Sequence, residues 1–478
     1  MSAFFSPEKV APVSRTCIIC GVAANSREHV FPAALGGRRT NKGIYCEEHN
    51  EAYSGLAGGI AEQLRFFNSQ LGVVGDHQRS TGMVKPVVML DATTKSEVRL
   101  NDKSISYVSP RILSPKADGE GGSTFVLAVN SPEEAEAFVA EMREKGMDIS
   151  IESVGYAGTY YPGTLQGKLD LGGKDTGLRA IAYIAQTFLA HSFPDLARLP
   201  QLAALKEYTL NGSHSDFAWW HHAKDDGLDA VGKPFAHRVI VGHNAEDDVI
   251  YARISLFEAL HYVVRLGVAP TATSRSMVFD IDPFAKHEPH DVIRTEYKDA
   301  VGYVPMPQDL TAHLSASISS GHAQAAVSSL MQRIQDHQRT TTAAKWLRDL
   351  ERINPAGPEA AGAFFERLVT EESARVLMLM ETFQREFIDF ASGTKDLELA
   401  TISANMSAHS ARDASSFDGL SEHGRMLLKI STAAIKQQLV GDFLNKLLDQ
   451  DRMAMLLGGG PGQYAVGMAV LERMRLPR

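Results

Sequence analysis

The sequence has few cysteines, no long apolar run and no excess of positive charge. Only three of its 478 residues are cysteine, an odd number, which excludes a disulfide framework like that of small secreted proteins. No apolar stretch approaches the roughly 20 residues needed to cross a bilayer. The N-terminus has no basic segment followed by an apolar core, so it does not have the pattern of a secretory signal. We therefore expect a cytoplasmic protein that does not enter the membrane.

Positive charge is scarce for a protein that would bind nucleic acid over a wide surface. The chain has 48 Lys or Arg residues against 57 Asp or Glu, a formal net charge of −9. Phosphate binding depends on Lys and Arg, so contact with nucleic acid has to be local. Residues 1–80 are close to neutral, and Arg38, Arg39 and Lys42 lie together there in one loop. We expect these three side chains to contact substrate phosphates.

Length and residue pattern indicate an α+β protein of several domains. A chain of 478 residues exceeds the usual size of one domain, and 44% hydrophobic with 22% charged residues is typical of globular proteins. We predict a first domain at residues 1–80, with its boundary in GVVGDHQRSTG, residues 72–82. A mixed α/β domain of unknown role follows at residues 81–310. Residues 311–478 form an all-helical domain for regulation or oligomerisation.

Alternating and β-branched residues predict the strands of the middle domain. The first group of strands is KPVVMLDA, SEVRLND, SISYVSP and STFVLAVN, and the second, an antiparallel meander, is HRVIVGHN, DDVIYARISLF and ALHYVVRLG. The short segment GIYC, residues 43–46, also has the composition of a strand. Gly and Pro residues predict a loop at residues 114–123.

Helices are predicted where apolar residues recur every three to four positions. Residues 47–72 have this character despite several glycines, and SPEEAEAFVAEMREKG begins with a capping serine. In DTGLRAIAYIAQTFLAHSF, the apolar residues Ile181, Ile184 and Phe188 have helical spacing. The C-terminal region repeats the pattern, with a break predicted in NPAGPEAAG, residues 354–362. Its apolar stripes indicate core packing or a homodimer interface.

All three cysteines fall in one pattern that predicts a metal site. Cys17-x2-Cys20 is followed by Cys46-x2-His49. Two ligands on a tight knuckle and two at the start of a helix can converge tetrahedrally, and thiolates with an imidazole suit Zn²⁺. The alternatives are three buried thiols with an unrelated histidine, or a site completed by another histidine such as His29. We predict a structural zinc site.

The segment between the two halves of this pattern carries a further motif. It reads EHVFPAALGG, then Asn41, and Asn50 follows His49 directly. This order resembles the HNH (ββα-metal) nuclease family, in particular the branch whose catalytic loop is held by a zinc knuckle. The resemblance covers residues 15–70. Two positions depart from the branch: His49 replaces the usual cysteine, and Asn50 replaces the third residue of the triplet, a substitution that the family also uses.

The resemblance implies a role for each residue of the motif. His29 would be the general base, since an imidazole can take a proton from water near neutral pH. Glu28 and Asn50 would hold a catalytic Mg²⁺ or Mn²⁺ through oxygen. Asn41 would fix the orientation of His29. The implied activity is the metal-dependent hydrolysis of DNA phosphodiester bonds, and the loop chemistry also allows RNA.

Each of these residues has a simpler explanation. Asn41 in TNKG could start a turn, and Glu28 could be a solvated carboxylate. On a flat strand, Glu28 and His29 point to opposite faces, so both reach one cation only if the backbone bends. The sequence WWHH, residues 219–222, with His214 and Asp216 nearby, indicates a buried aromatic patch or a second metal site.

The larger part of the chain would then target or restrain the nuclease. Proteins that resemble this family act in restriction, phage defence and mobile elements. Two other classes of function stay open. One is a zinc-knuckle DNA-binding protein without catalysis. The other is a ligand-sensing protein whose nuclease is activated by a small molecule.

Overall fold

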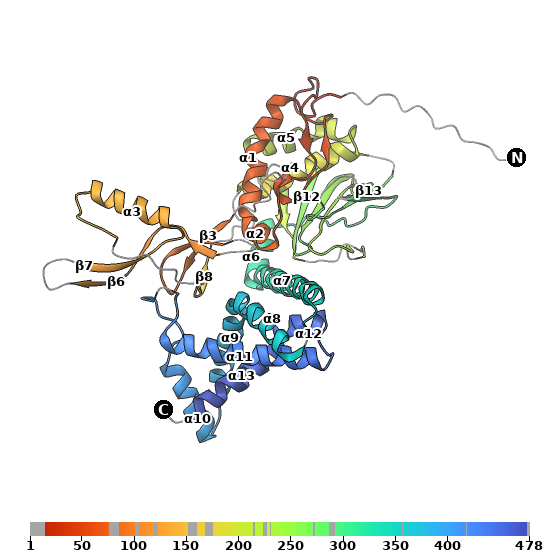
Figure 1. Ribbon diagram of the computed structural model, residues 1–478. Helices are drawn as coiled ribbons and strands as arrows, with labels where there is room; N and C mark the ends of the chain where they lie inside the picture. The colour runs from red at the N-terminus through yellow and green to blue at the C-terminus, as the bar shows by residue number, and fades with distance from the viewer. Residues whose placement is uncertain are drawn as a thin grey trace. The chain divides into compact units, whose positions relative to one another are not determined.

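The computed structural model divides the chain into two units, and each is built from two separate stretches of sequence (Figure 1). Unit 1 contains Met1–Val87 and Lys168–Gln332, and unit 2 contains Val88–Gly167 and Arg333–Arg478. The packing therefore groups the chain differently from the three consecutive ranges predicted from sequence. The structure describes residues 15–75, 86–100, 105–117, 123–151, 160–167, 175–213, 216–222, 227–229, 231–270, 273–285, 292–355, 357–416 and 418–475.

Unit 1 begins with a small hairpin followed by a helix. Strands β1 (Glu28–His29) and β2 (Thr40–Asn41) pair antiparallel, and the short 3-10 helix η1 (Ala33–Leu35) lies between them in sequence. Helices α1 (Glu47–Gln63) and α2 (Arg65–Leu71) follow and confirm the helix predicted at residues 47–72. The predicted strand GIYC was wrong, because the paired strand ends at Asn41.

The largest part of unit 1 is a six-stranded antiparallel sheet with helix α4 (Asp175–Ser192). Its strand order is β14-β13-β10-β11-β12-β9. The strands are β9 (Ala218–Trp220), β10 (His237–Asn244), β11 (Val249–Leu256), β12 (Leu260–Val268), β13 (Arg275–Ile281) and β14 (Val292–Tyr297). Strands β10 to β12 are the predicted meander, which is confirmed.

Helix α4 connects this sheet to the N-terminal hairpin and helix. It packs against β9, β10, β11 and β12, and it also packs against α1. Every described residue from Ala180 to Ala190 is buried, which is why the segment has so few charges. Shorter helices complete the unit: η3 (Leu196–Arg198), η4 (Pro200–Leu202), α5 (Ala203–Asn211) and α6 (Leu310–Ser319). Helix α7 (His322–Ile353) begins here and continues into unit 2.

The first part of unit 2 is built mainly of strands. One sheet has the order β5-β4-β3-β8, and β6 pairs with β7. The elements are β3 (Val87–Asp91), β4 (Glu97–Leu100), β5 (Ile105–Tyr107), β6 (Arg111–Ala117), β7 (Ser123–Ala128), α3 (Pro132–Glu144) and β8 (Leu165–Gln166). The Ser131 side chain accepts a hydrogen bond from the Glu134 N–H, which confirms the predicted serine cap of α3.

The rest of unit 2 is helical. After α7 come α8 (Gly357–Glu371), α9 (Ser373–Ser392), α10 (Leu397–Ala408), α11 (Glu422–Leu444), α12 (Gln450–Leu456) and α13 (Gly460–Arg475). Their apolar faces share one core that includes Trp346, Phe365 and Met380. The chain is thus a mixed α/β protein with a helical C-terminal region, in agreement with the predicted class.

Two predicted breaks in secondary structure were partly wrong. Residues 114–117 belong to strand β6, where Pro115 lies at a shift in register between Leu113 and Lys116. A proline has no N–H to donate to the ladder, and it is tolerated there because the ladder is interrupted at the register shift. The predicted break at residues 354–362 is shorter, since α8 begins at Gly357. Most of the predicted boundary at residues 72–82 lies outside the described residues. Within the described residues, no helix combines the length and apolarity needed to cross a membrane.

Candidate functional site

The three cysteines and His49 meet at the N-terminal end of helix α1. Cys17 begins a tight turn in which its N–H donates to Val22 O (2.7 Å) and its carbonyl accepts from Gly21 N–H (3.0 Å). Gly21 has a φ of +76°, a conformation that a glycine adopts without strain. Cys46 is the N-cap of α1, which places His49 in the first turn of that helix. The knuckle and the helix start are therefore brought together as the spacing predicted.

The donor atoms of these four residues have the separations of a metal site. All four lie within 4.8 Å of one another. Cys20 Sγ is 3.8 Å from Cys46 Sγ, and Cys46 Sγ is 3.0 Å from His49 Nδ1. Two thiolates bound tetrahedrally at about 2.3 Å from zinc would be separated by about 3.8 Å. The group Cys17, Cys20, Cys46 and His49 could thus hold a metal ion such as zinc.

Backbone amides favour ionisation of the innermost thiol. Burial raises the pKa of Cys17, but hydrogen bonds from the N–H groups of Cys20, Cys46 and Ile19 outweigh it, so the pKa is lowered. The pKa of Cys20 is raised, by burial and by its two neighbouring thiols. Three adjacent thiols repel one another when ionised, so a cation among them would favour the thiolate form of all three.

The predicted catalytic residues of the N-terminal hairpin lie on two opposite faces of it. Glu28 pairs with Asn41, and His29 pairs with Thr40. Residues directly opposite each other in an antiparallel pair share a face, and successive residues alternate. The side chains of Glu28 and Asn41 therefore share the face that contacts α4, and His29 lies on the other face.

Glu28 is a buried acid with one hydrogen-bond donor. Glu28 is only 9% exposed, and the Tyr183 hydroxyl donates a hydrogen bond to its Oε1. Burial raises the pKa of Glu28 to about 7, although the bond from Tyr183 opposes the rise. The alternative of a solvated carboxylate is therefore wrong.

Asn41 makes contacts within its own turn and to helix α4. Its Oδ1 accepts from Gly43 N–H (2.7 Å), which agrees with the simpler alternative that this residue starts a turn. Its Nδ2 lies 3.0 Å from His191 Nδ1. Burial, with the charges of Arg39 and Arg294, lowers the pKa of His191 to about 4. The ring is then neutral at pH 7, and its Nδ1 can accept the proton of the amide.

Asn50 lies in the first turn of α1, where its N–H donates to Cys46 O (2.9 Å). Its side-chain Oδ1 is buried, and no hydrogen-bond donor reaches it within the described part of the chain. A buried amide oxygen without a donor is costly unless something else supplies positive charge. An oxygen of this kind is a suitable ligand for a hard divalent cation.

The three basic residues of the loop have different surroundings. Arg38 is buried, and its guanidinium donates to the carbonyls of Val74 (2.7 Å) and Ala285 (3.2 Å). This arrangement ties the loop to the rest of unit 1, a role that differs from the predicted phosphate contact. Arg39 is half-buried beside His191, and Lys42 is exposed.

Helix α4 supplies residues that the sequence interpretation missed. Tyr183 contacts Glu28, Thr187 Oγ1 lies 3.0 Å from Tyr45 Oη, and His191 contacts Asn41. The sequence signal was available as polar residues four positions apart in an otherwise apolar helix. The apolar spacing of the same helix predicted only a face packed in the core.

Two other features of the molecule lie outside this group of residues. After the buried Trp219 and Trp220, the His222 ring lies 4.6 Å from that of His322. Among the described residues, the side chains placed to hold a metal are those of Cys17, Cys20, Cys46 and His49. The histidines of WWHH do not belong to this group. His214 lies outside the described residues.

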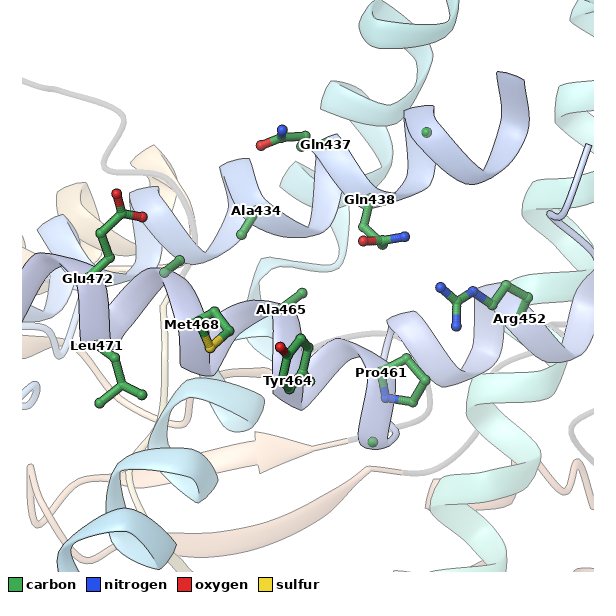
Figure 2. A pocket seen from close by; sticks show the side chains of 13 residues that line it. Ala434, Gln437, Gln438, Arg452, Pro461, Tyr464, Ala465, Met468, Leu471 and Glu472 are labelled. Atoms are coloured by element: carbon green, nitrogen blue, oxygen red, sulfur yellow. The ribbon is translucent and has the colours of Figure 1, made fainter. Parts of the chain in front are cut away.

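The second feature is an open cavity in unit 2. Its volume is about 1180 Å³, and helices α11 and α13 line it together with Arg452 (Figure 2). Gln437 and Gln438 lie on one side, and Tyr464 and Met468 lie on the other. It contains no histidine or cysteine among its lining residues, so it lacks the ligands of a transition-metal site.

Comparison of the chain with protein-family models, curated proteins and solved structures gave no match.

Proposed function

We propose that this protein is a zinc-containing, metal-dependent endonuclease of the HNH type that hydrolyses DNA. The observation that carries the proposal is the order of elements around one loop. A hairpin bearing Glu28 and His29 is followed by a helix that begins with Cys46, His49 and Asn50. This is the β-β-α order that the family resemblance implies, with the four-ligand metal group at the base of the helix.

The side chains divide the chemistry between them. His29 takes a proton from the attacking water. Because His29 lies on the hairpin face opposite Glu28, the proposal requires the backbone to bend at this strand so that both side chains act on one phosphate. Glu28 and Asn50 provide oxygens for Mg²⁺ or Mn²⁺. A cation bound there would stabilise the negative charge that develops on the phosphorus oxygens and the leaving oxygen.

Zinc would serve as a structural clasp in this proposal. The ligands Cys17 and Cys20 precede the hairpin, and Cys46 and His49 follow it. One ion bound to all four fixes both ends of a loop that contains Gly36, Gly37 and Gly43. Structural zinc sites contribute directly to folding, so removal of the ion would loosen the loop.

Substrate contact in this proposal is local. Arg39 and Lys42 are the basic side chains of the loop that are not buried, and they would contact the DNA phosphates. Such contacts position a nucleic acid without selecting its sequence. The rest of the chain would restrain or target cleavage, as part of a homodimer or with an activating partner, in the cytoplasm.

The test is cleavage of plasmid DNA by the full-length protein with Mg²⁺ or Mn²⁺. His29→Ala should lower the rate at least 100-fold, because loss of a general base typically costs 10²–10⁴-fold. His313→Ala serves as the matched control, since His313 lies on α6 and outside the motif. Equal cleavage by wild type and His29→Ala would refute the assignment of the base.

One observation favours the DNA-binding protein without catalysis as a second candidate. Glu28 is buried, and burial favours its neutral form when no cation is present, although the hydrogen bond from Tyr183 opposes this effect. That candidate predicts DNA binding without cleavage in Mg²⁺, Mn²⁺ or Ca²⁺. The cavity between α11 and α13 is where the ligand-sensing alternative would find its small molecule.

A further inference from the structure

Helix α4 presents a row of polar side chains to the proposed nuclease loop. Tyr183, Thr187 and His191 are spaced four residues apart, so they lie on one face of the helix. Each contacts a different residue of the loop: Glu28, Tyr45 and Asn41, respectively. A helix that begins more than 100 residues after the motif therefore touches two of its four predicted catalytic residues.

The first residue of this row is held rigidly. Tyr183 is 3% exposed, and its ring stacks on that of Tyr53, with centroids 4.7 Å apart and planes at 22°. The Tyr45 ring lies 6.3 Å away in a stacked arrangement. Gln186 Nε2 donates to the hydroxyls of both neighbours, at 3.2 Å to Tyr45 and 3.3 Å to Tyr53. The hydroxyl of Tyr183 is thus fixed in place before any cation binds.

The contact with Tyr183 orients the acid asymmetrically. The hydroxyl donates to Glu28 Oε1. Within the described part of the chain Oε2 accepts no such bond, so Oε2 would be the oxygen that binds a cation. Carboxylates that ligate metals are commonly held by a second hydrogen bond in this way, and loss of the partner typically weakens metal binding 10- to 100-fold.

We propose that Tyr183 is a positioning residue for the cation site of the loop, acting through Glu28. This inference rests on the proposed function, since it assumes that Glu28 is a ligand of the divalent cation. It adds that the site is completed by a helix of the middle region, outside the segment that resembles the nuclease family.

A purely structural role would have a different signature. If the hydroxyl of Tyr183 only satisfies a buried acid, its removal lowers stability and leaves the affinity for the cation unchanged. If it positions Glu28, its removal weakens cation binding in the absence of DNA. Cation affinity therefore separates the two roles, whereas a loss of activity alone would not.

The experiment measures Mn²⁺ binding to the full-length, zinc-loaded protein by electron paramagnetic resonance, without DNA. Tyr183→Phe keeps the stacked ring and removes only the hydroxyl. Tyr251→Phe is the matched control, because Tyr251, buried on strand β11 of the same unit, donates a hydrogen bond to Val301 O (2.7 Å) and lies outside the motif. Glu28→Gln is the reference for loss of the ligand.

We expect Tyr183→Phe to raise the dissociation constant for Mn²⁺ about tenfold or more, with Tyr251→Phe unchanged. If Tyr183→Phe binds Mn²⁺ as wild type does while Glu28→Gln does not, the positioning role is refuted and the proposed function stands. If Glu28→Gln binds as tightly as wild type, the cation site itself is refuted, and the proposed mechanism fails with it.

Terbium luminescence provides a second measurement that needs no Tyr183 variant. Excited tyrosine transfers energy to nearby Tb³⁺, so wild type should sensitise the ion strongly and Glu28→Gln should not. Tb³⁺ that binds in a manner dependent on Glu28 but is not sensitised would place the tyrosine cluster away from the cation. That result would overturn the proposal.

Discussion

At the scale of single residues, the burial of Glu28 affects both the stability of the fold and the binding of a cation. The acid is packed against Tyr183 and close to Tyr45, where its charged form loses the solvation of water. A bound cation would compensate for that loss, because an opposite charge stabilises the ionised form. The site therefore binds a cation most readily when Glu28 is ionised.

This burial predicts a pH dependence of stability in the absence of divalent cations. The folded protein raises the pKa of Glu28 from its ordinary value of 4.5 to about 7. The neutral acid is thus favoured by folding, and the associated stability is complete below pH 4.5 and declines as pH rises through 7. Glu28→Gln should remove that decline, whose upper limit is about 3 kcal/mol at 1.36 kcal/mol per pH unit.

Urea unfolding of wild type and Glu28→Gln between pH 4.5 and 8.5 measures this difference directly. Other titrating groups are common to both proteins and cancel in the comparison. Glu207→Gln, at an exposed position of α5, should show the wild-type pH dependence. Parallel profiles for wild type and Glu28→Gln would contradict the prediction.

The metal group predicts a second residue-scale outcome. Purified protein should contain about one zinc per chain, and Cys17→Ser should lose the ion, because a structural zinc site is held by four protein ligands and Cys17 supplies one of them. The midpoint of thermal unfolding should fall with it, since binding of a structural zinc is part of the folding free energy. Elemental analysis and calorimetry measure both, and a fully stable, metal-free wild type would refute the site.

At the scale of elements, the loop between β1 and β2 depends on a close approach of two backbone segments. A Cβ atom on Gly37 would lie 2.0 Å from the carbonyl oxygen of Phe31, and one on Gly36 would lie 2.5 Å from Pro283 Cα. Backbone atoms cannot move aside as a side chain does. Gly37 therefore allows the loop to fold closely onto its own first residues, and Gly36 allows it to pack against the turn after β13.

Substitution of glycine by alanine should have opposite effects in neighbouring elements. Gly37→Ala should destabilise the protein by about 3 kcal/mol or more, as is usual for severe overpacking. Gly58→Ala, in the exposed face of α1 with nothing within 4 Å of its Cβ, should stabilise it by about 0.5–1 kcal/mol. Chemical denaturation of both variants measures the difference. Similar stability changes in the two variants would contradict this account.

Elements that depend on local pattern could be predicted from the sequence. The serine cap of α3, the β10 to β12 meander and the knuckle of Cys17 and Cys20 follow from residues that are close together in the chain. The fourth candidate ligand of the metal, His49, could also be predicted from the sequence, because Cys46 and His49 lie three residues apart at the start of one helix. These features involve short-range geometry that a one-dimensional pattern records.

Contacts over long sequence distances could not be predicted in the same way. The partner of Glu28 lies 155 residues away, and the partner of Asn41 lies 150 residues away. Nothing in the periodicity of either segment identifies the other. The same reason explains why the division into two interleaved units was not foreseen, since chain order suggests consecutive domains.

At the scale of the whole molecule, the proposed nuclease segment is part of a larger folding unit. Arg198 donates to Thr16 O (2.5 Å) and Gly43 O (3.1 Å), and His237 Nε2 lies 3.1 Å from Leu35 O. Together with the contacts of α4, these bonds show that residues between 183 and 237 supply hydrogen-bond partners to polar groups of the N-terminal segment. Met1–Val87 and Lys168–Gln332 form one compact unit, and we expect this unit to unfold cooperatively.

A fragment of residues 1–80 should consequently fail to fold, even with zinc. Its buried Phe31, Tyr45 and Phe67 would lose their cover from the rest of unit 1. Circular dichroism and denaturant titration in the presence of zinc test this, with full-length protein as the control. A fragment with a cooperative transition and full helix content would contradict the prediction.

The interleaving also has a consequence for the newly made chain. Ribosomes add about 5–20 residues per second, so Glu28 would be added to the chain roughly 8–30 seconds before Tyr183. During this interval the four candidate zinc ligands are already made, but helix α4, which contacts Glu28, does not yet exist. We expect the order of synthesis to delay maturation of the proposed cutting centre, so that an unfinished polypeptide is harmless to the cell that makes it.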